Sequence, residues 1–224
     1  MKLNGKLLIL FLLLGGQINP NKDADARKIL ELYPTDDTYI MSALPDATRG
    51  TSSDLVIGNA KDWRDRILLR FNISSIPITE RIIQSDLYLY CWGYIGTSAS
   101  RFVDVYRMGW SWSENEATWN NSSNYYSTPS YYGTYTGGDG GWKKWRVTDL
   151  VREWHKGTYW NYGMMLIPNP EKVEGTNMLY HYSKESKVVN GTPTLIKNRG
   201  TQKKSGEKIG GHNTKIKIGG HNTN

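Results

Sequence analysis

The chain of 224 residues contains a single cysteine, Cys91, and therefore forms no disulfide within itself. Its surroundings, SDLYLYCW, favour a buried thiol over a reactive one. A fold without disulfides depends on its hydrophobic core, and this length suffices for one domain with such a core. Phenylalanine is also scarce, with three residues against fifteen Tyr and nine Trp. Rings with a polar tip suit half-buried sheet faces and ligand surfaces.

Long hydrophobic runs are missing as well. The longest, Leu7–Leu14, has eight residues, whereas a membrane-spanning helix needs about 20. Two lysines precede the run and small residues follow it at 15–17, which predicts a secretory signal over residues 1–17. The alternative is an N-terminal helix of the mature fold. We therefore expect a secreted, extracellular or cell-surface protein that does not span the membrane.

No basic stripe lies on any one element of the central part of the chain. The formal charge is +7, but most of it comes from the tail at 197–224. That tail contains KIGGHNT twice, at 208–214 and 217–223, and its composition predicts a disordered basic appendage. We expect no nucleic-acid partner, because the rest of the chain is close to neutral.

Alternation of apolar and polar residues with period two predicts strands. In Asp65–Ile73 the apolar residues at 67, 69, 71 and 73 share one face, and in Ser85–Trp92 Leu87, Leu89 and Cys91 do. One helix is expected near 148–156, where Thr148 is the candidate N-cap and Gly157 the C-terminal stop. Further strands are expected at 29–33, 38–41, 55–57, 102–108, 116–119, 162–167, 178–183 and 194–196.

Many short strands, frequent turns and one short helix predict an all-β fold, an antiparallel β-sandwich of jelly-roll type. The predicted organisation is a signal peptide at 1–17, a flexible lead-in at 18–28, the sandwich domain at 29–196 and the tail at 197–224. Residues 120–141 are read as one long loop, which is functional or disordered when it occurs inside a compact domain.

Several segments together resemble a known family, the DNRLRE domains, which are related to disaggregatase-related repeats and overlap family ninety-six of the carbohydrate-binding modules. The matching segments occur in the family's order: YPTDDTYI (33–40), DRILLRFNISSIP (65–77), IQSDLYLY (83–90), WSENEATW (112–119), WRVTDLVREWHKGTYWNYGMML (145–166), HYSKES (181–186) and TPTLI (192–196). The resemblance implies a jelly-roll sandwich with an accessory or surface role, often beside polysaccharide-degrading domains.

Alternation also predicts a candidate sugar-binding face. If the leucines of 85–92 and the apolar residues of 65–73 point inward, a set of rings and guanidinium groups points outward. Sugars stack on aromatic rings, and guanidinium groups fit carboxylates in a bidentate fork, so such a face suits an acidic polysaccharide. The alternative is that these residues form ordinary cross-strand pairs or are covered by a loop. The outward set is Arg66, Arg70, Tyr88, Tyr90 and Trp92.

A second candidate contact is the tyrosine-rich part of the loop before Trp142, which contains Tyr131 and Tyr132 together with Tyr125, Tyr126 and Tyr135. Tyrosine among Ser, Gly and Asn is the composition of adaptable binding loops. The alternative is a lid that packs its rings on the sandwich.

A calcium site is the third candidate, because hard cations prefer several oxygen ligands and acidic residues lie in or beside the loops. The residues singled out are Asp36, Asp37 and Asp139. The alternative is that these are ordinary solvated carboxylates, since no EF-hand spacing is present.

The sequence gives little sign of a catalytic site. A glycosidase needs two carboxylates at a set distance, and only Glu114 and Glu116, which flank a motif, suggest themselves. We therefore expect a secreted, non-catalytic module that binds polysaccharide. The alternative is a cell-surface structural or adhesive protein that self-associates or is tethered to the envelope by its basic tail.

Overall fold

The computed structural model describes residues 6–12, 27–96, 101–127, 132–136, 140–171 and 175–187. The chain divides into two units, Met1–Gly191 and Thr192–Asn224, and the second lies outside the described residues. The elements are β1 (Lys6–Leu12), β2 (Arg27–Leu32), β3 (Pro34–Met41), β4 (Asp54–Ala60), β5 (Trp63–Phe71), β6 (Arg81–Gly96), β7 (Arg101–Arg107), α1 (Trp119–Ser122), β8 (Tyr132–Thr136), β9 (Gly141–Arg146), α2 (Thr148–His155), β10 (Met164–Asn169) and β11 (Thr176–Tyr182).

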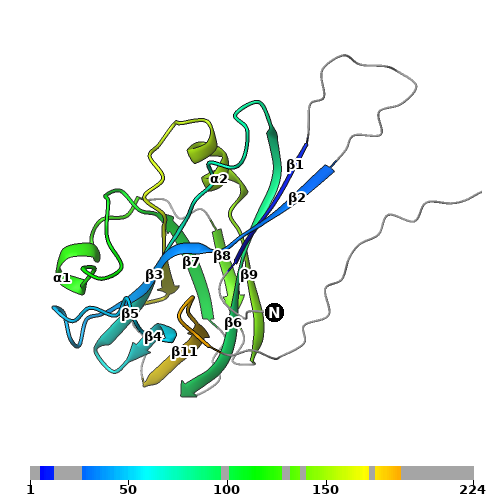
Figure 1. The fold of residues 1–224 in the computed structure, drawn as a ribbon. Coiled ribbons are helices and arrows are strands. Elements are labelled where there is room, and N and C mark those ends of the chain that lie inside the picture. Colours follow the sequence, from blue (N-terminus) through cyan, green and yellow to red (C-terminus); the bar gives the residue numbers. More distant parts are fainter. Residues whose placement is uncertain are drawn as a thin grey trace, which may run out of the picture. The chain divides into compact units, whose positions relative to one another are not determined.

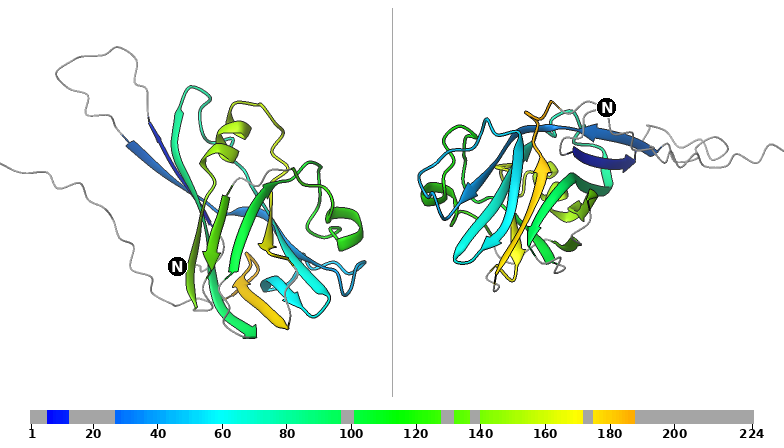
Figure 2. Two further views of the ribbon diagram at one scale, coloured as in Figure 1. Left: turned by 180° about the vertical axis from the view of Figure 1, so that it is seen from behind. Right: turned by 90° about the horizontal axis from the view of Figure 1, so that it is seen from below.

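The strands pair antiparallel and form one continuous sheet that folds over into two layers (Figures 1 and 2). The first layer contains β3, β5, β10, β7 and β8. The second layer contains β4, β11, β6 and β9. A short ladder between β4 and β5 joins the layers at one corner. The predicted all-β antiparallel sandwich is therefore confirmed.

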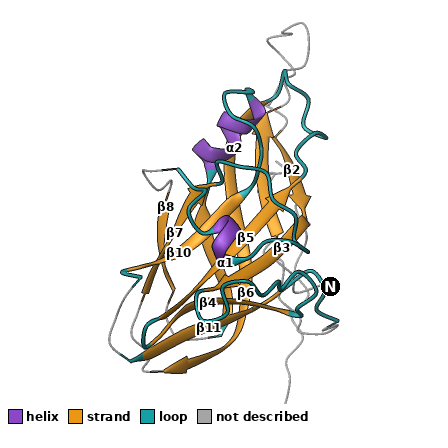
Figure 3. Cartoon of the chain, turned by 90° about the vertical axis from the view of Figure 1, so that its left-hand side faces the viewer, coloured by secondary structure: helices purple, strands orange, loops and turns teal. Residues whose placement is uncertain are grey.

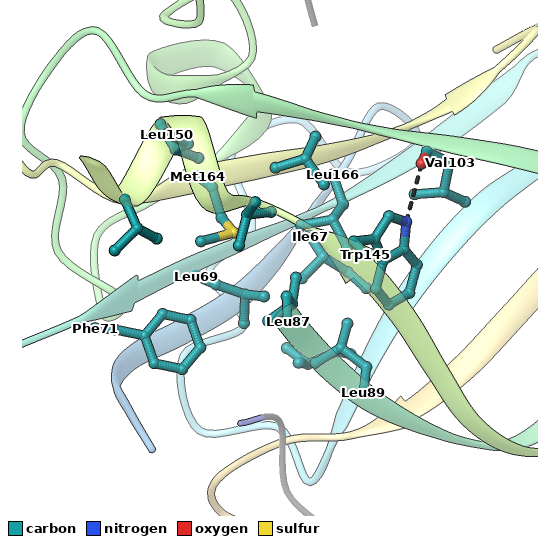
Figure 4. Packing of buried hydrophobic residues seen from close by; sticks show 14 of the residues in the cluster. Ile67, Leu69, Phe71, Leu87, Leu89, Val103, Trp145, Leu150, Met164 and Leu166 are labelled. Atoms are coloured by element: carbon teal, nitrogen blue, oxygen red, sulfur yellow. Dashed lines mark hydrogen bonds between the residues drawn. The ribbon is translucent and has the colours of Figure 1, made fainter. Parts of the chain in front are cut away.

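The core lies between the layers and follows the alternation of β5 and β6. Ile67 and Leu69 of β5 face Leu87 and Leu89 of β6, and all four side chains are buried (Figure 4). Trp145 of β9 packs in the same buried cluster, and its indole Nε1 donates a hydrogen bond to the Val103 carbonyl at 2.9 Å. Apolar burial of this kind is the main driving force for folding.

Helix α2 lies at one end of the sandwich and is the helix that the sequence predicts (Figure 1). Its apolar face, Leu150, Val151 and Trp154, is buried. Gly157 follows with a φ of 70°, the left-handed conformation that glycine adopts at little cost. Thr148 is not the N-cap, however. It forms the first turn, and its hydroxyl instead accepts the Ser85 backbone N–H at 3.0 Å, which attaches the helix to β6.

The outer face of the first layer is covered by residues 109–127, which we call the cover segment. It packs Trp112 and Ala117 on Leu68 and Met165 of the layer, with α1 beside β3 and β5 (Figure 3). A capping box of Thr118 and Asn121 starts α1. The predicted strand at 116–119 is therefore wrong. The predicted loop at 120–141 is also too simple, because it includes α1 and β8.

The segment predicted as a secretory signal includes β1, which pairs with β2 and with the Arg81–Tyr88 part of β6. An apolar run suits both uses, since it can serve as a signal core before cleavage or as a strand in the sheet. Cleavage after residue 17 would remove β1 and leave that edge of β6 without its neighbour. Neither of the two described helices has the length and apolar character to cross a bilayer.

We expect Trp145→Ala to lower the free energy of unfolding by about 3–5 kcal/mol, because it opens a cavity between the layers and removes a buried hydrogen bond. Urea titration followed by circular dichroism measures the change. The matched control is Trp160→Ala, whose side chain is 79% exposed, and which should change stability by less than about 0.5 kcal/mol. Equal losses in the two variants would contradict this account of the core.

Candidate carbohydrate-binding surface

The outer face of the second layer carries a row of aromatic rings, which we call the aromatic strip. It arises from register: the leucines of β6 face the core, so the alternate residues face outward. β9 and β11 flank β6 and add rings on the same face, with Trp142 opposite Tyr90. The six rings are Tyr88, Tyr90, Trp92, Trp142, Tyr180 and Tyr182.

The rings of the strip support one another across the strands. Trp142 meets Tyr90 edge-on, with centroids 5.4 Å apart. Tyr90 stacks on Tyr182 at 5.9 Å with planes only 14° apart, and Tyr182 in turn stacks on Trp92 at 6.2 Å. Trp92 also contacts Tyr180 at 5.4 Å. Such contacts fix ring orientations before any ligand arrives, which lowers the entropy cost of binding.

Polar groups flank the strip at both ends. The indole Nε1 of Trp92, whose side chain is 46% exposed, donates to Asp54 Oδ1 at 3.0 Å. Near the other end, Lys144 and Arg146 both pair with the buried carboxylate of Asp86, at 3.0 and 3.2 Å. Two cations share one anion there, so this end carries a positive charge.

Lys144 also lies near the strip itself, with its ammonium 5.7 Å from the centroid of the Tyr88 ring. Burial by itself lowers the pKa of Lys144, but the hydrogen bond and negative charge of Asp86 outweigh it and raise the pKa above its usual range. The lysine therefore stays charged at any physiological pH.

His181 lies between two strip residues of β11 but points to the opposite side, into the core beside Trp145. Burial lowers the pKa of His181 to about 3, and the charge of Lys143 acts in the same direction. Cys91, on the same inner face of β6, is the buried thiol that the sequence predicts, and burial raises its pKa. Both residues therefore lie in the core, on the inner face of the strands that carry the strip.

The two arginines expected on an exposed face lie elsewhere, under the cover segment. Arg66 is only 5% exposed, and its guanidinium donates two hydrogen bonds to the Glu171 carboxylate, at 2.6 and 3.0 Å. It also donates to the Ser123 carbonyl at 2.5 Å and lies over the rings of Trp119 and Tyr126. The outward orientation was predicted correctly, but the exposure was not, because residues 109–127 fold back over this face.

Arg70 is half-buried for the same reason. It forms an ion pair with Asp36 at 2.7 Å and lies 5.5 Å from the centroid of Trp112. Burial acts to raise the pKa of Asp36, but the hydrogen bonds of Arg70 and Thr35 outweigh it and hold the pKa below its usual range. Arg66 and Arg70 therefore fasten the cover segment to the first layer rather than face a ligand.

The other residues singled out from the sequence are separated. Tyr125 is exposed, and Tyr126 packs edge-on against Tyr106 at 4.9 Å. Tyr132 belongs to β8, of which only the backbone is described, and Tyr131 and Asp139 lie outside the described residues. Glu114 is ion-paired with Lys184, whereas Glu116 is exposed. A role for the tyrosines of this loop stays a prediction.

Three rings of the strip were not found from the sequence: Trp142, Tyr180 and Tyr182. A signal was present, because residues 142, 144 and 146 alternate with the buried Trp145, and Tyr180 and Tyr182 alternate with the buried His181. Which strands become neighbours depends on long-range pairing, which a single sequence does not display.

The fold and the strip together define a class of protein: an antiparallel β-sandwich with a ring-lined outer face. Within this class, the family model for carbohydrate-binding module family 96 matches residues 28–197, and the chain belongs to that family. Its members bind carbohydrate without catalysing a reaction, which confirms the prediction of a non-enzymatic module. No curated protein matches the chain.

We expect the contribution of His181 to the stability of the protein to fall as pH decreases from about 6.5 toward 3. The histidine is neutral in both states above its unfolded pKa of 6.5 and takes up a proton only on unfolding below it, until the folded pKa of about 3 is reached. Each pH unit in this window costs about 1.4 kcal/mol.

Urea titration at pH 7.5 and 4.5 tests this effect. Wild type should lose about 2–3 kcal/mol more than His181→Phe between the two values. Burial raises the pKa of Asp37 and Asp65 and gives the opposite trend, but that contribution is common to both proteins and cancels in the comparison. Equal losses would mean that His181 is accessible to protons in the folded state.

Proposed function

We propose that the chain binds an acidic extracellular polysaccharide on the aromatic strip. The observation that carries the proposal is the row of six mutually braced rings on an outer face of the sandwich, with Trp92 the most exposed of them on β6. Rings held on rigid strands present flat apolar surfaces at little entropic cost, and the C–H faces of sugars stack on such surfaces.

The polar groups at the ends of the strip support a preference for acidic sugars. The two positive charges of Lys144 and Arg146 exceed the single negative charge of Asp86, and both basic side chains remain about half exposed. A uronate carboxylate that reaches this end would meet one ammonium and one guanidinium group, whose geometry suits a carboxylate. Among the described residues, the charged group that contacts Trp92 is the carboxylate of Asp54, so the expected glycan carboxylate lies near Tyr88.

An extracellular location supports the same function, since the sequence of residues 1–17 has the composition of a secretory signal. The second function considered from the sequence, an adhesive protein tethered by its basic tail, depends on residues 197–224, which lie outside the described residues. It stays a prediction.

We expect Trp92→Ala and Tyr182→Ala each to weaken polysaccharide binding by about tenfold or more, because each removes one of the stacked rings of the strip. Affinity electrophoresis in gels that contain uronate-rich or neutral polysaccharides measures the loss. Trp110→Ala is the matched control, since Trp110 is exposed but lies in the cover segment. Equal retardation of all three variants and wild type would remove the strip as the binding surface.

The charge at the Tyr88 end has its own test. Arg146→Gln should weaken binding to uronate-rich polysaccharide by several-fold and leave binding to neutral polysaccharide unchanged, because it removes one of the two cations. Lys156→Gln, which removes an exposed cation next to α2, should have no effect on either. The wild-type affinity for uronate-rich polysaccharide should also fall with added salt. A salt-independent affinity would contradict a preference for acidic sugars but leave the strip itself in place.

A further inference from the structure

Three carboxylates from distant parts of the chain meet at one edge of the first layer. Asp37 comes from β3, Glu114 from the cover segment and Glu185 from the turn after β11. Each offers an oxygen, and these oxygens all lie within 4.8 Å of one another. Like charges this close repel strongly unless a positive charge lies between them.

Asp37 is the deepest of the three, with only 1% of its surface exposed. Its Oδ2 accepts the Lys184 backbone N–H at 2.8 Å. Its Oδ1 is buried, as is Glu185 Oε2, and neither atom has a hydrogen-bond partner among the described residues. An ionised carboxylate oxygen can only accept, so leaving both of these oxygens unpaired is costly unless the two carboxyls share a proton or a cation lies between them.

Lys184 provides one positive charge at the mouth of this group. Its ammonium lies 2.7 Å from Glu114 Oε2 and also contacts Glu185. The lysine side chain is partly exposed, whereas the unpaired oxygen of Asp37 lies inside. When all three carboxyls are ionised, one ammonium leaves two negative charges unbalanced, and the lysine does not hydrogen-bond Asp37 Oδ1.

We propose that Asp37, Glu114 and Glu185 form a calcium site that fastens the cover segment to the sandwich. All three donors are oxygens, which hard cations prefer, and a divalent ion balances the remaining charge. Lys184 then swings toward solvent and competes with the ion for Glu114 and Glu185. The neighbouring Asp36 is no ligand, because Arg70 holds both of its oxygens.

Calcium titration of protein treated with EDTA tests the site, with isothermal titration calorimetry for stoichiometry and differential scanning fluorimetry for stability. We expect one calcium ion per chain with a Kd of about 10⁻⁴–10⁻³ M, the range of extracellular modules. At ten times the Kd, the folding equilibrium constant should rise about elevenfold. Magnesium, which demands a stricter geometry, should bind more weakly.

Three variants separate the site from nonspecific binding. Asp37→Asn should abolish the calcium-dependent stabilisation, whereas Asp149→Asn, whose side chain is 81% exposed, should retain it in full. Lys184→Met should bind calcium more tightly than wild type, because it removes the competing ammonium. This variant keeps the test decisive if Asp37→Asn fails to fold.

The alternative is that Lys184 and a shared proton neutralise the carboxylates without any ion. In that case calcium would bind neither wild type nor Lys184→Met, and Lys184→Met would be less stable at every calcium concentration. Either observation overturns the proposal. The strip contains none of these side chains, so that result would leave the proposed sugar surface itself in place.

Discussion

The alternation along β6 is the constraint on which both the core and the binding surface depend. Leu87, Leu89 and Cys91 are fully buried against the first layer, and this forces Tyr88, Tyr90 and Trp92 to the outside. A slip of one residue would expose the leucines and bury the rings, so the apolar burial that stabilises the fold also fixes the position of the rings. The aromatic strip is therefore rigid because its other face is the core.

The same alternation gives different results on the two outer faces of the sandwich, because one face is covered by another segment and, among the described residues, the other is not. β5 also turns polar side chains outward, but the cover segment lies over them and converts Arg66 into a buried clamp between Glu171 and the Ser123 carbonyl. Removing one partner of such a buried pair costs far more than removing a surface ion pair. The face of β6 has no such cover among the described residues, and its rings pack on one another instead.

Much of the fold was predictable from local pattern, because strand alternation and the apolar face of α2 are properties of short segments. The sequence therefore identified the sandwich, the helix and three of the six strip rings. It failed where distant segments meet. Nothing local indicates that residues 109–127 fold over Arg66 and Arg70, or that Trp142 and Tyr182 become neighbours of Tyr90. The same limit explains why Asp37 was singled out without Glu114 and Glu185, which are remote in sequence.

The proposed sugar surface and the proposed calcium site are joined by a very short piece of chain. Tyr182 closes the strip, and Ser183 follows with its hydroxyl donating to the Ser52 carbonyl at 2.6 Å and its backbone N–H to the Ser53 carbonyl at 3.1 Å. Glu185 lies two residues further along, in the same turn. A calcium ion bound there would order this turn and the end of β11, and with them the position of Tyr182. By linkage, a sugar held against Tyr182 must then favour ion binding by the same factor.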